Sequence, residues 1–170
     1  MELEERVAAL ERRIAALEGE REHAPQPPPG GDFWALAGFK ERLAAAGPAA
    51  ADGGVLFTGT VGLPTGERYD WQYGELTSAL LDVDWTETAD AFAALGHAVR
   101  LRLLREIVGG RNTAAALAEL DGLGTTGQIY HHLRQLTAVG WLRTVGRGRY
   151  EVPPARVVPL LVMVSASRPV

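Results

Sequence analysis

The stretch that decides the fold is "TTGQIYHHLRQLTAVGWLRTVGRGRYEV", which runs from Thr125 to Val152. Its first half has helical periodicity, because Ile129, Leu133 and Leu136 share one face when residues advance by about 100°. Thr125 is a favoured N-cap residue, so we expect a helix over residues 125–139. After the helix, "WLRTV" and "RYEV" predict two short strands, and the glycines between them permit a tight turn.

A short helix is expected just before this stretch, in "TAAALAEL" (residues 113–120), with "DGLG" as the connecting turn. Two helices joined in this way predict helix-turn-helix geometry, in which the first helix supports a second whose polar face can enter a major groove. The polar face of the second helix gathers Gly127, Tyr130, His131 and Arg134. The pattern therefore favours double-stranded DNA as a partner.

Arginines follow the two expected strands and their turn, at Arg143, Arg147 and Arg149. Guanidinium groups at a loop tip suit phosphate oxygens or a narrow minor groove. The whole chain has a formal charge of -4, yet residues 97–170 hold ten basic groups, all of them arginine, against four acidic ones. This asymmetry is expected when only that third of the protein meets a polyanion, and chance partition of surface charge is the alternative.

Two more helices are expected upstream. Asp84 and Glu87 are spaced as a capping box for a helix that ends near Gly96. Its periodic face contains Trp85, Ala89, Phe92 and Leu95. The next helix covers residues 98–108 and is expected to point Leu101, Leu104, Ile107 and Val108 inward. Its outward side is expected to hold Arg100, Arg102 and Arg105.

Taken in order, "ALGHAVRLRLLREIVGG" (94–110), "TAAALAEL" and "YHHLRQLTAVGWLRTVGRGRYEV" (130–152) resemble an ArsR-type winged helix-turn-helix transcriptional regulator. The resemblance covers roughly residues 85–168, and the fixed order of the motifs is more specific than any one of them. It implies that Thr126, Gly127, Tyr130 and His131 face DNA and that Arg147 and Arg149 lie on the wing. The full set of candidate DNA-binding residues is Thr126, Gly127, Gln128, Tyr130, His131, Arg134, Arg143, Arg147 and Arg149.

A metal site is disfavoured. His131 and His132 point about 100° apart on a helix and cannot readily share one ion, and the chain has no cysteine. Members of the family that sense metals do so through cysteines or through His and acidic ligands on the C-terminal helix, and "ARVVPLLVMVSAS" contains neither carboxylate nor imidazole. We expect no metal and no cofactor. His132 is expected to pack at the helix edge, and His131 to be exposed.

That C-terminal segment, residues 155–167, is apolar nearly all round and predicts a covered helix, with Pro159 near its start. A strand is the alternative, because the segment is rich in β-branched residues. The resemblance implies that terminal helices form the dimer interface. The expected dimerisation residues here are Val157, Leu160, Leu161 and Val164.

The N-terminal part predicts separate elements. Residues 1–23 carry a heptad seam made of Leu3, Val7, Leu10, Ile14 and Leu17. The seam favours a parallel coiled coil, and the alternative is one amphipathic helix folded on its own domain. Residues 24–32 form a proline-glycine linker that ends at Asp32, a candidate cap for a helix ended by Gly47-Pro48. The coil either adds a contact within one dimer or joins dimers into tetramers or chains.

A β-hairpin with Pro64 and Gly66 in its turn completes the accessory region of residues 33–83. One face of the hairpin is aromatic, and it either packs on a helix or forms a pocket for a small-molecule effector. The candidate pocket residues are Phe57, Tyr69, Trp71 and Tyr73.

The sequence thus predicts a mainly α fold with small β elements, in which residues 84–170 form a winged helix-turn-helix domain with a C-terminal dimerisation helix. No catalytic motif is recognisable, so an enzyme is not expected. With no apolar run long enough for a membrane span and no signal peptide, we expect a cytoplasmic protein without a membrane partner. The leading hypothesis is a homodimeric DNA-binding regulator. The alternative is a winged-helix structural or protein-interaction module that forms higher-order assemblies without sequence-specific DNA binding.

Overall fold

The computed structural model describes residues 33–168, of which residues 33–51 belong to one compact unit and residues 52–168 to a second. The predicted coiled coil (Leu3, Val7, Leu10, Ile14, Leu17), the linker and the Asp32 cap lie outside the described residues. In the first unit, the predicted helix is confirmed as α2 (Trp34–Ala46) and is followed by a 3-10 turn, η2 (Gly47–Ala50). Gly47 ends α2 with a positive φ of 69°, a conformation that glycine adopts without strain.

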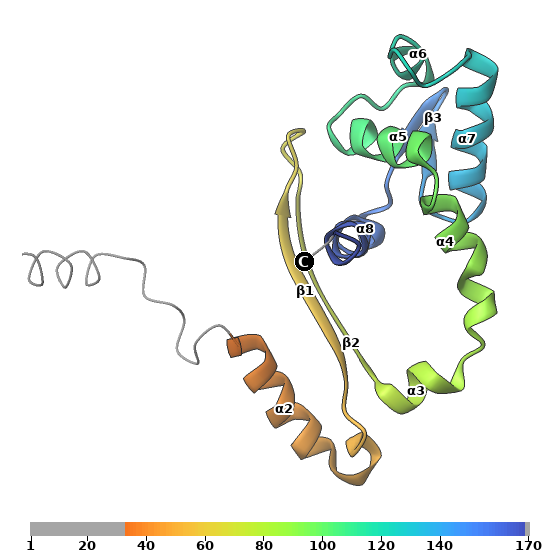
Figure 1. Cartoon of the computed structure of the whole chain (residues 1–170). Helices are drawn as coiled ribbons and strands as arrows, with labels where there is room; N and C mark the ends of the chain where they lie inside the picture. The colour runs from red at the N-terminus through yellow and green to blue at the C-terminus, as the bar shows by residue number, and fades with distance from the viewer. Residues whose placement is uncertain (1–32, 169–170) are drawn as a thin grey trace, which may run out of the picture. The chain divides into compact units, whose positions relative to one another are not determined.

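The second unit is mainly helical and contains two antiparallel hairpins (Figure 1). Its elements in chain order are β1 (Gly54–Gly62), β2 (Arg68–Leu76), α3 (Thr77–Asp82), η3 (Trp85–Thr88), α4 (Ala89–Leu95), α5 (Ala98–Val108), α6 (Ala114–Ala118), α7 (Thr126–Ala138), β3 (Arg143–Gly146), β4 (Arg149–Glu151) and α8 (Pro154–Ala166). The coarse prediction of a mainly α fold with small β elements is therefore confirmed. The short α3 was not predicted, because six residues are too few to show a helical period.

One apolar core joins α4 to α8. Its most deeply buried side chains include Leu103, Leu117, Leu133 and Leu136, each 0% exposed. Trp141 lies in the same core, where its indole N–H donates to the carbonyl of Ala91 (3.0 Å). That bond satisfies the polar group of a buried Trp and fixes the loop after α7 against α4.

The predicted hairpin is confirmed as β1–β2, paired from Gly54↔Leu76 to Gly62↔Arg68. Near the turn and at its middle, its aromatic face packs on the core and on α8, whereas Val55 and Tyr73 at the other end are exposed. Val61, Leu63 and Tyr69, near the turn, contact the core. Farther along the same face, β1 passes so close to α8 that a Cβ on Gly59 would lie 2.7 Å from Cγ1 of Val158. Only glycine permits this approach without a shift of the Val158 side chain.

The C-terminal segment is a helix, α8, so the strand alternative is wrong. Pro159 lies in its first two turns. Two of the predicted dimerisation residues must be corrected, because Val157 (1% exposed) and Leu160 (4%) are buried in the core of their own chain. The other two, Leu161 (38%) and Val164 (45%), remain exposed.

The segment before α4 also differs from expectation. The chain turns as a 3-10 helix at η3, and Asp84 accepts a hydrogen bond from the Thr86 N–H (2.9 Å) instead of forming a capping box with Glu87. The tighter winding of a 3-10 turn shifts side chains off the face that an α-helix would bury. Trp85, in this turn, is accordingly 65% exposed, and Phe92, on α4 itself, is 60% exposed.

Helix α5 has the predicted bounds, but its buried face is rotated. Leu103 is fully buried beside Leu104 and Ile107, whereas Leu101, which was expected inside, is 39% exposed. The reason is that α5 contacts α4, α7 and β4, and together these neighbours cover the Leu103 side.

Among residues 33–168, no helix has both the length and the apolar content that crossing a bilayer requires.

Candidate nucleic-acid interface

Helices α6 and α7 begin at side-chain caps that the sequence predicts. The Thr113 hydroxyl accepts from the Ala116 N–H (3.2 Å) at the start of α6. At the start of α7, the Thr125 hydroxyl accepts from the Gln128 N–H (3.4 Å), and the Gln128 side-chain oxygen accepts from the Thr125 N–H (2.8 Å). This reciprocal capping box fixes where α7 starts and how its first turn is oriented.

Helix α7 has one buried and one exposed face, as predicted. Ile129, Leu133 and Leu136 are buried against neighbouring helices, and α7 contacts both α5 and α6. The opposite face presents Thr126, Gly127, Gln128, Tyr130, His131 and Arg134, all of them exposed. Because the Gln128 oxygen is held in the cap, this side chain has less freedom to read a base edge than its neighbours have.

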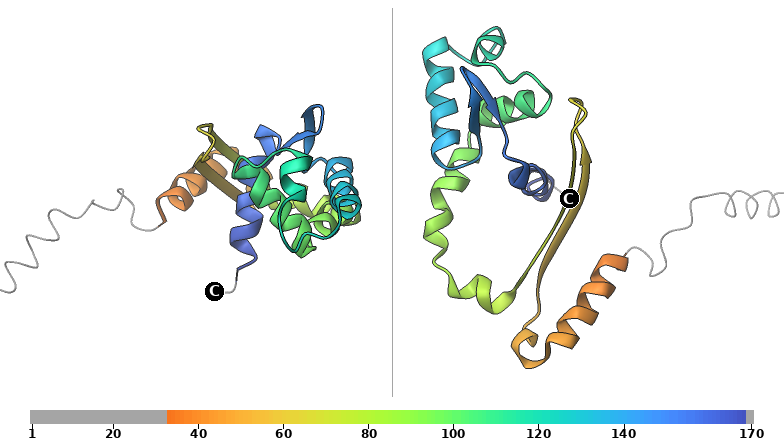
Figure 2. Two further views of the ribbon diagram at one scale, coloured as in Figure 1. Left: turned by 90° about the horizontal axis from the view of Figure 1, so that it is seen from above. Right: turned by 180° about the vertical axis from the view of Figure 1, so that it is seen from behind.

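The β3–β4 hairpin lies beside α7 and is held by the loop before α6 (Figures 1 and 2). The Tyr150 N–H donates to the carbonyl of Asn112 (2.8 Å), and the Ala114 N–H donates to the carbonyl of Gly148 (2.9 Å). A β-bridge also pairs Thr113 with Arg149. These backbone contacts set the position of the hairpin without depending on the identity of its side chains.

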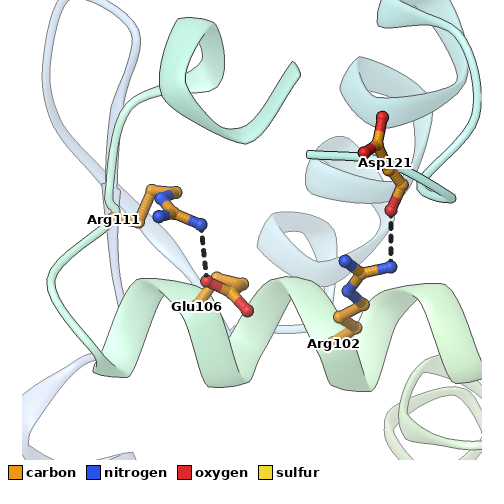
Figure 3. A network of polar contacts seen from close by, with 4 residues as sticks. All are labelled: Arg102, Glu106, Arg111 and Asp121. Carbon is orange, nitrogen blue, oxygen red and sulfur yellow. Dashed lines mark hydrogen bonds and ion pairs between the residues drawn. The ribbon is translucent and has the colours of Figure 1, made fainter. Parts of the chain in front are cut away.

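Several arginines of the basic C-terminal third stabilise the fold. Arg102 donates to the carbonyl of Asp121 (2.7 Å) and so ties α5 to the turn before α7, and Arg111 pairs with Glu106 at 3.0 Å (Figure 3). Arg143, a candidate DNA-binding residue, pairs with Glu151 across the β3–β4 hairpin. Some of the positive charges of this third are thus paired with groups of the protein itself.

Arg100 was expected to point outward, and the structure places it half-buried between helices. Its guanidinium donates to the carbonyls of Ala93 (2.7 Å) and Ala94 (2.5 Å) at the end of α4, and to the side-chain oxygen of Gln135 on α7 (2.7 Å). A cation suits the last carbonyls of a helix, which lack partners within that helix. Sequence pattern alone did not indicate this contact, because Gln135 lies 35 residues farther along the chain.

Three candidate arginines remain available on the exposed side. Arg134 of α7, Arg147 at the turn and Arg149 of β4 are exposed, and none of them takes part in a salt bridge within residues 33–168. A helix face without an acidic side chain thus lies beside a hairpin that carries two unpaired cations. Chemically, the arrangement offers guanidinium, hydroxyl and imidazole donors to an anion.

The paired histidines behave differently from each other, as predicted. His131 is exposed, whereas His132 is half-buried and its ring lies tilted against that of His97, with ring centroids 4.7 Å apart. Burial lowers the pKa of His132, and the nearby His97, Arg100 and His131 lower it further. His97 itself caps α5 by accepting from the Val99 N–H (3.2 Å). Sequence reasoning missed the contact between His97 and His132, because it forms only when α5 packs against α7.

Within residues 33–168, no three His, Asp or Glu side chains come together in a way that could hold an ion. The contacts of the histidines are with one another, with Arg100 and with Gln135. They form a packed edge of α7.

The candidate effector residues lie along one face of β1–β2. Tyr69 contacts the core, Trp71 is half-buried opposite Gly59, and Phe57 and Tyr73 form a tilted ring pair 5.6 Å apart. Two apolar grooves of about 480 and 400 Å³ lie elsewhere, along α8 against α5 and α4, and none of the four aromatic residues lines them. An effector site at the hairpin therefore stays a prediction.

Comparison of the chain with models of protein families, with curated proteins and with solved structures finds no match.

Proposed function

We propose that this protein is a dimeric DNA-binding transcriptional regulator of the winged helix-turn-helix type. In this proposal α7 is the recognition helix, α6 supports it, and the β3–β4 hairpin is the wing. The ArsR-type resemblance of the sequence motifs led to the same assignment. The observation that carries it is the exposed polar face of α7 beside a hairpin whose Arg147 and Arg149 have no ion-pair partner within residues 33–168.

Each part of this surface has a distinct role. The N-terminal half of α7 presents Thr126, Tyr130 and His131 to base edges, where a helix fits the major groove. Arg147 and Arg149 contact phosphate or the minor groove, and Arg134 adds one charge on the helix. Arg143 contributes less than the sequence alone implied, because its guanidinium is already paired with Glu151.

This allocation predicts a modest salt dependence. Three available arginines per copy give at most six ion-pair contacts per dimer, so log K against log salt concentration falls with a slope of about -5 or shallower. Fluorescence anisotropy with DNA fragments recovered by a genome-wide pull-down measures this slope. A much steeper slope would show that other basic groups carry the contact.

Replacing both wing arginines tests the site directly. Arg147→Ala with Arg149→Ala is expected to weaken binding to all duplexes alike and to reduce the slope by about 2 per copy, because phosphate contacts carry no sequence information. Arg105→Ala with Arg168→Ala is the matched control, since both side chains are exposed and lie on α5 and just after α8, away from the wing. Equal losses in the two double variants, or no enriched DNA in the pull-down, would overturn the proposal in favour of a protein-interaction module.

A further inference from the structure

The junction between α4 and α5 lies beside α7, and the side chain of His132 is at their contact (Figure 1). Its ring meets that of His97, the residue that caps α5, with ring centroids 4.7 Å apart. One nitrogen of this half-buried ring is sealed off, because Nδ1 is buried and has no hydrogen-bond partner within residues 33–168. That nitrogen is therefore closed to solvent and lies outside the proposed DNA-facing side of α7.

The buried nitrogen of His132 accommodates a neutral imidazole better than an imidazolium. In the neutral ring only one nitrogen carries a proton, so Nδ1 can remain without one. Protonation makes both nitrogens donors, and the N–H at Nδ1 would then be buried without an acceptor. A buried donor without a partner destabilises the packed state, and a charged donor does so more strongly. The contact between α7 and α5 therefore favours the neutral form.

The charges around His132 act in the same direction as its burial. Three groups that are cations, or become cations as the pH falls, act on it: His97, Arg100 and His131. No acidic side chain of residues 33–168 is among the groups that shift its pKa. Only Gln135 favours protonation, through a side-chain hydrogen bond, and its oxygen already accepts from Arg100 (2.7 Å). A proton on His132 would therefore add a cation to a cluster that has no anion to balance it.

The same contact positions the candidate recognition helix. Arg100 of α5 donates to the side-chain oxygen of Gln135, which lies three residues after His132 on α7. The ring contact and this hydrogen bond thus join the start of α5 to one stretch of α7. On its other face, α7 is held separately by its buried apolar side chains. We therefore expect a local opening at this contact to move α7 without unfolding the core.

We propose that His132 is a proton-sensitive positioning residue: when it takes up a proton, α7 separates from the start of α5 and DNA binding weakens. The neutral ring keeps α7 in the orientation that presents Tyr130 and His131 on its exposed face. Histidine suits this role, because its charge changes between about pH 5 and 8. The inference rests on the proposed function, since it assigns regulation by pH to the same DNA-binding helix.

The opening is tested without DNA, by hydrogen exchange of the α7 amides at pH 7.5 and pH 5.5. After correction for intrinsic exchange rates, the opening constant is expected to rise by up to about tenfold at pH 5.5, because the open state takes up one more proton. His132→Phe keeps a ring against His97 but cannot be protonated, so its opening constant is expected to be the same at both pH values. His131→Asn, at the adjacent exposed position, is the matched control and is expected to retain the rise.

An equal rise in His132→Phe and in the wild-type protein would overturn the proposal, and His132→Asn replaces the Phe variant if circular dichroism shows that the latter does not fold.

DNA affinity is then measured at both pH values in the His131→Asn background, which removes an exposed imidazole whose own charge would strengthen phosphate contacts. Affinity is expected to fall by up to about tenfold at pH 5.5, and adding His132→Phe is expected to abolish this fall. Affinity that does not change with pH while the opening constant rises would overturn the regulatory role. If no DNA binds at any pH and the opening still depends on His132, the proposed function alone is refuted.

Discussion

Two surfaces of the second unit, one on α7 and the β3–β4 hairpin and one on α8, expose side chains of different chemistry. The α7 and β3–β4 side exposes cations, hydroxyls and an imidazole, whereas the α8 side exposes large apolar side chains such as Leu161 and Val164. The first suits a hydrated polyanion, which polar contacts recognise. The second suits another apolar surface. One small unit thus has two surfaces of opposite chemistry, because the core lies between them.

The comparison is sharpest on α7, where the two faces of one helix can be separated by mutation. Leu133→Ala removes a fully buried side chain and is expected to reduce the free energy of unfolding by about 2–5 kcal/mol. Tyr130→Ala, three residues earlier on the exposed face, is expected to change it by less than about 0.5 kcal/mol while weakening DNA binding. Urea unfolding and anisotropy measure the two quantities. A large loss of stability in Tyr130→Ala would show that this residue is structural.

On the apolar side, the contact between β1 and α8 is the point to break. Gly59→Val is expected to lower the free energy of unfolding by about 1–3 kcal/mol, because its side chain meets Val158. Gly62→Val is the control, since a Cβ there meets no atom within 4 Å. Thermal unfolding compares the two. If both variants lose the same stability, β propensity and not close packing governs the strand.

The smallest effect expected is a pH dependence at the boundary between the two sides. Because the pKa of His132 in the folded protein lies below its ordinary value of 6.5, the unfolded chain takes up a proton first as the pH falls. The stabilisation is therefore complete above pH 6.5 and is lost as the pH falls from there through the folded-state pKa. His97, Arg100 and His131 all face this imidazole and oppose its protonation.

Urea unfolding at pH 7.5 and pH 5.5 checks this dependence. His132→Asn is expected to flatten the difference between the two pH values, and His131→Asn, at an exposed position, is expected to retain it. Retention in both variants would assign the dependence to another group.

The parts of the fold that sequence predicted are those with local signals. The cap and period of α7 depend on Thr125, Gln128 and residues within a few turns, so its bounds were predicted within one residue. The β1–β2 hairpin likewise follows from alternation and from Pro64 and Gly66 in its turn. The exposed side of α7 was predicted for the same reason.

The sequence did not predict those features that depend on which side of a helix or strand is covered by its neighbours. Helix α8 is apolar all round, so its pattern could not show that Val157 and Leu160 face the core of their own chain. Arg100 looked like a surface charge until α4 and α7 were placed beside it. Likewise, Arg143 could be recognised as paired only when the register placed Glu151 opposite.

The three hydrogen bonds of Arg100 hold the end of α4 and the middle of α7 in a fixed relative position. Since α4 borders the apolar side and α7 the polar side, a displacement of α4 carries α7 with it. In the proposed dimer, these hydrogen bonds therefore link the position of α4 to the spacing between the two α7 helices, which DNA half-sites of fixed spacing require.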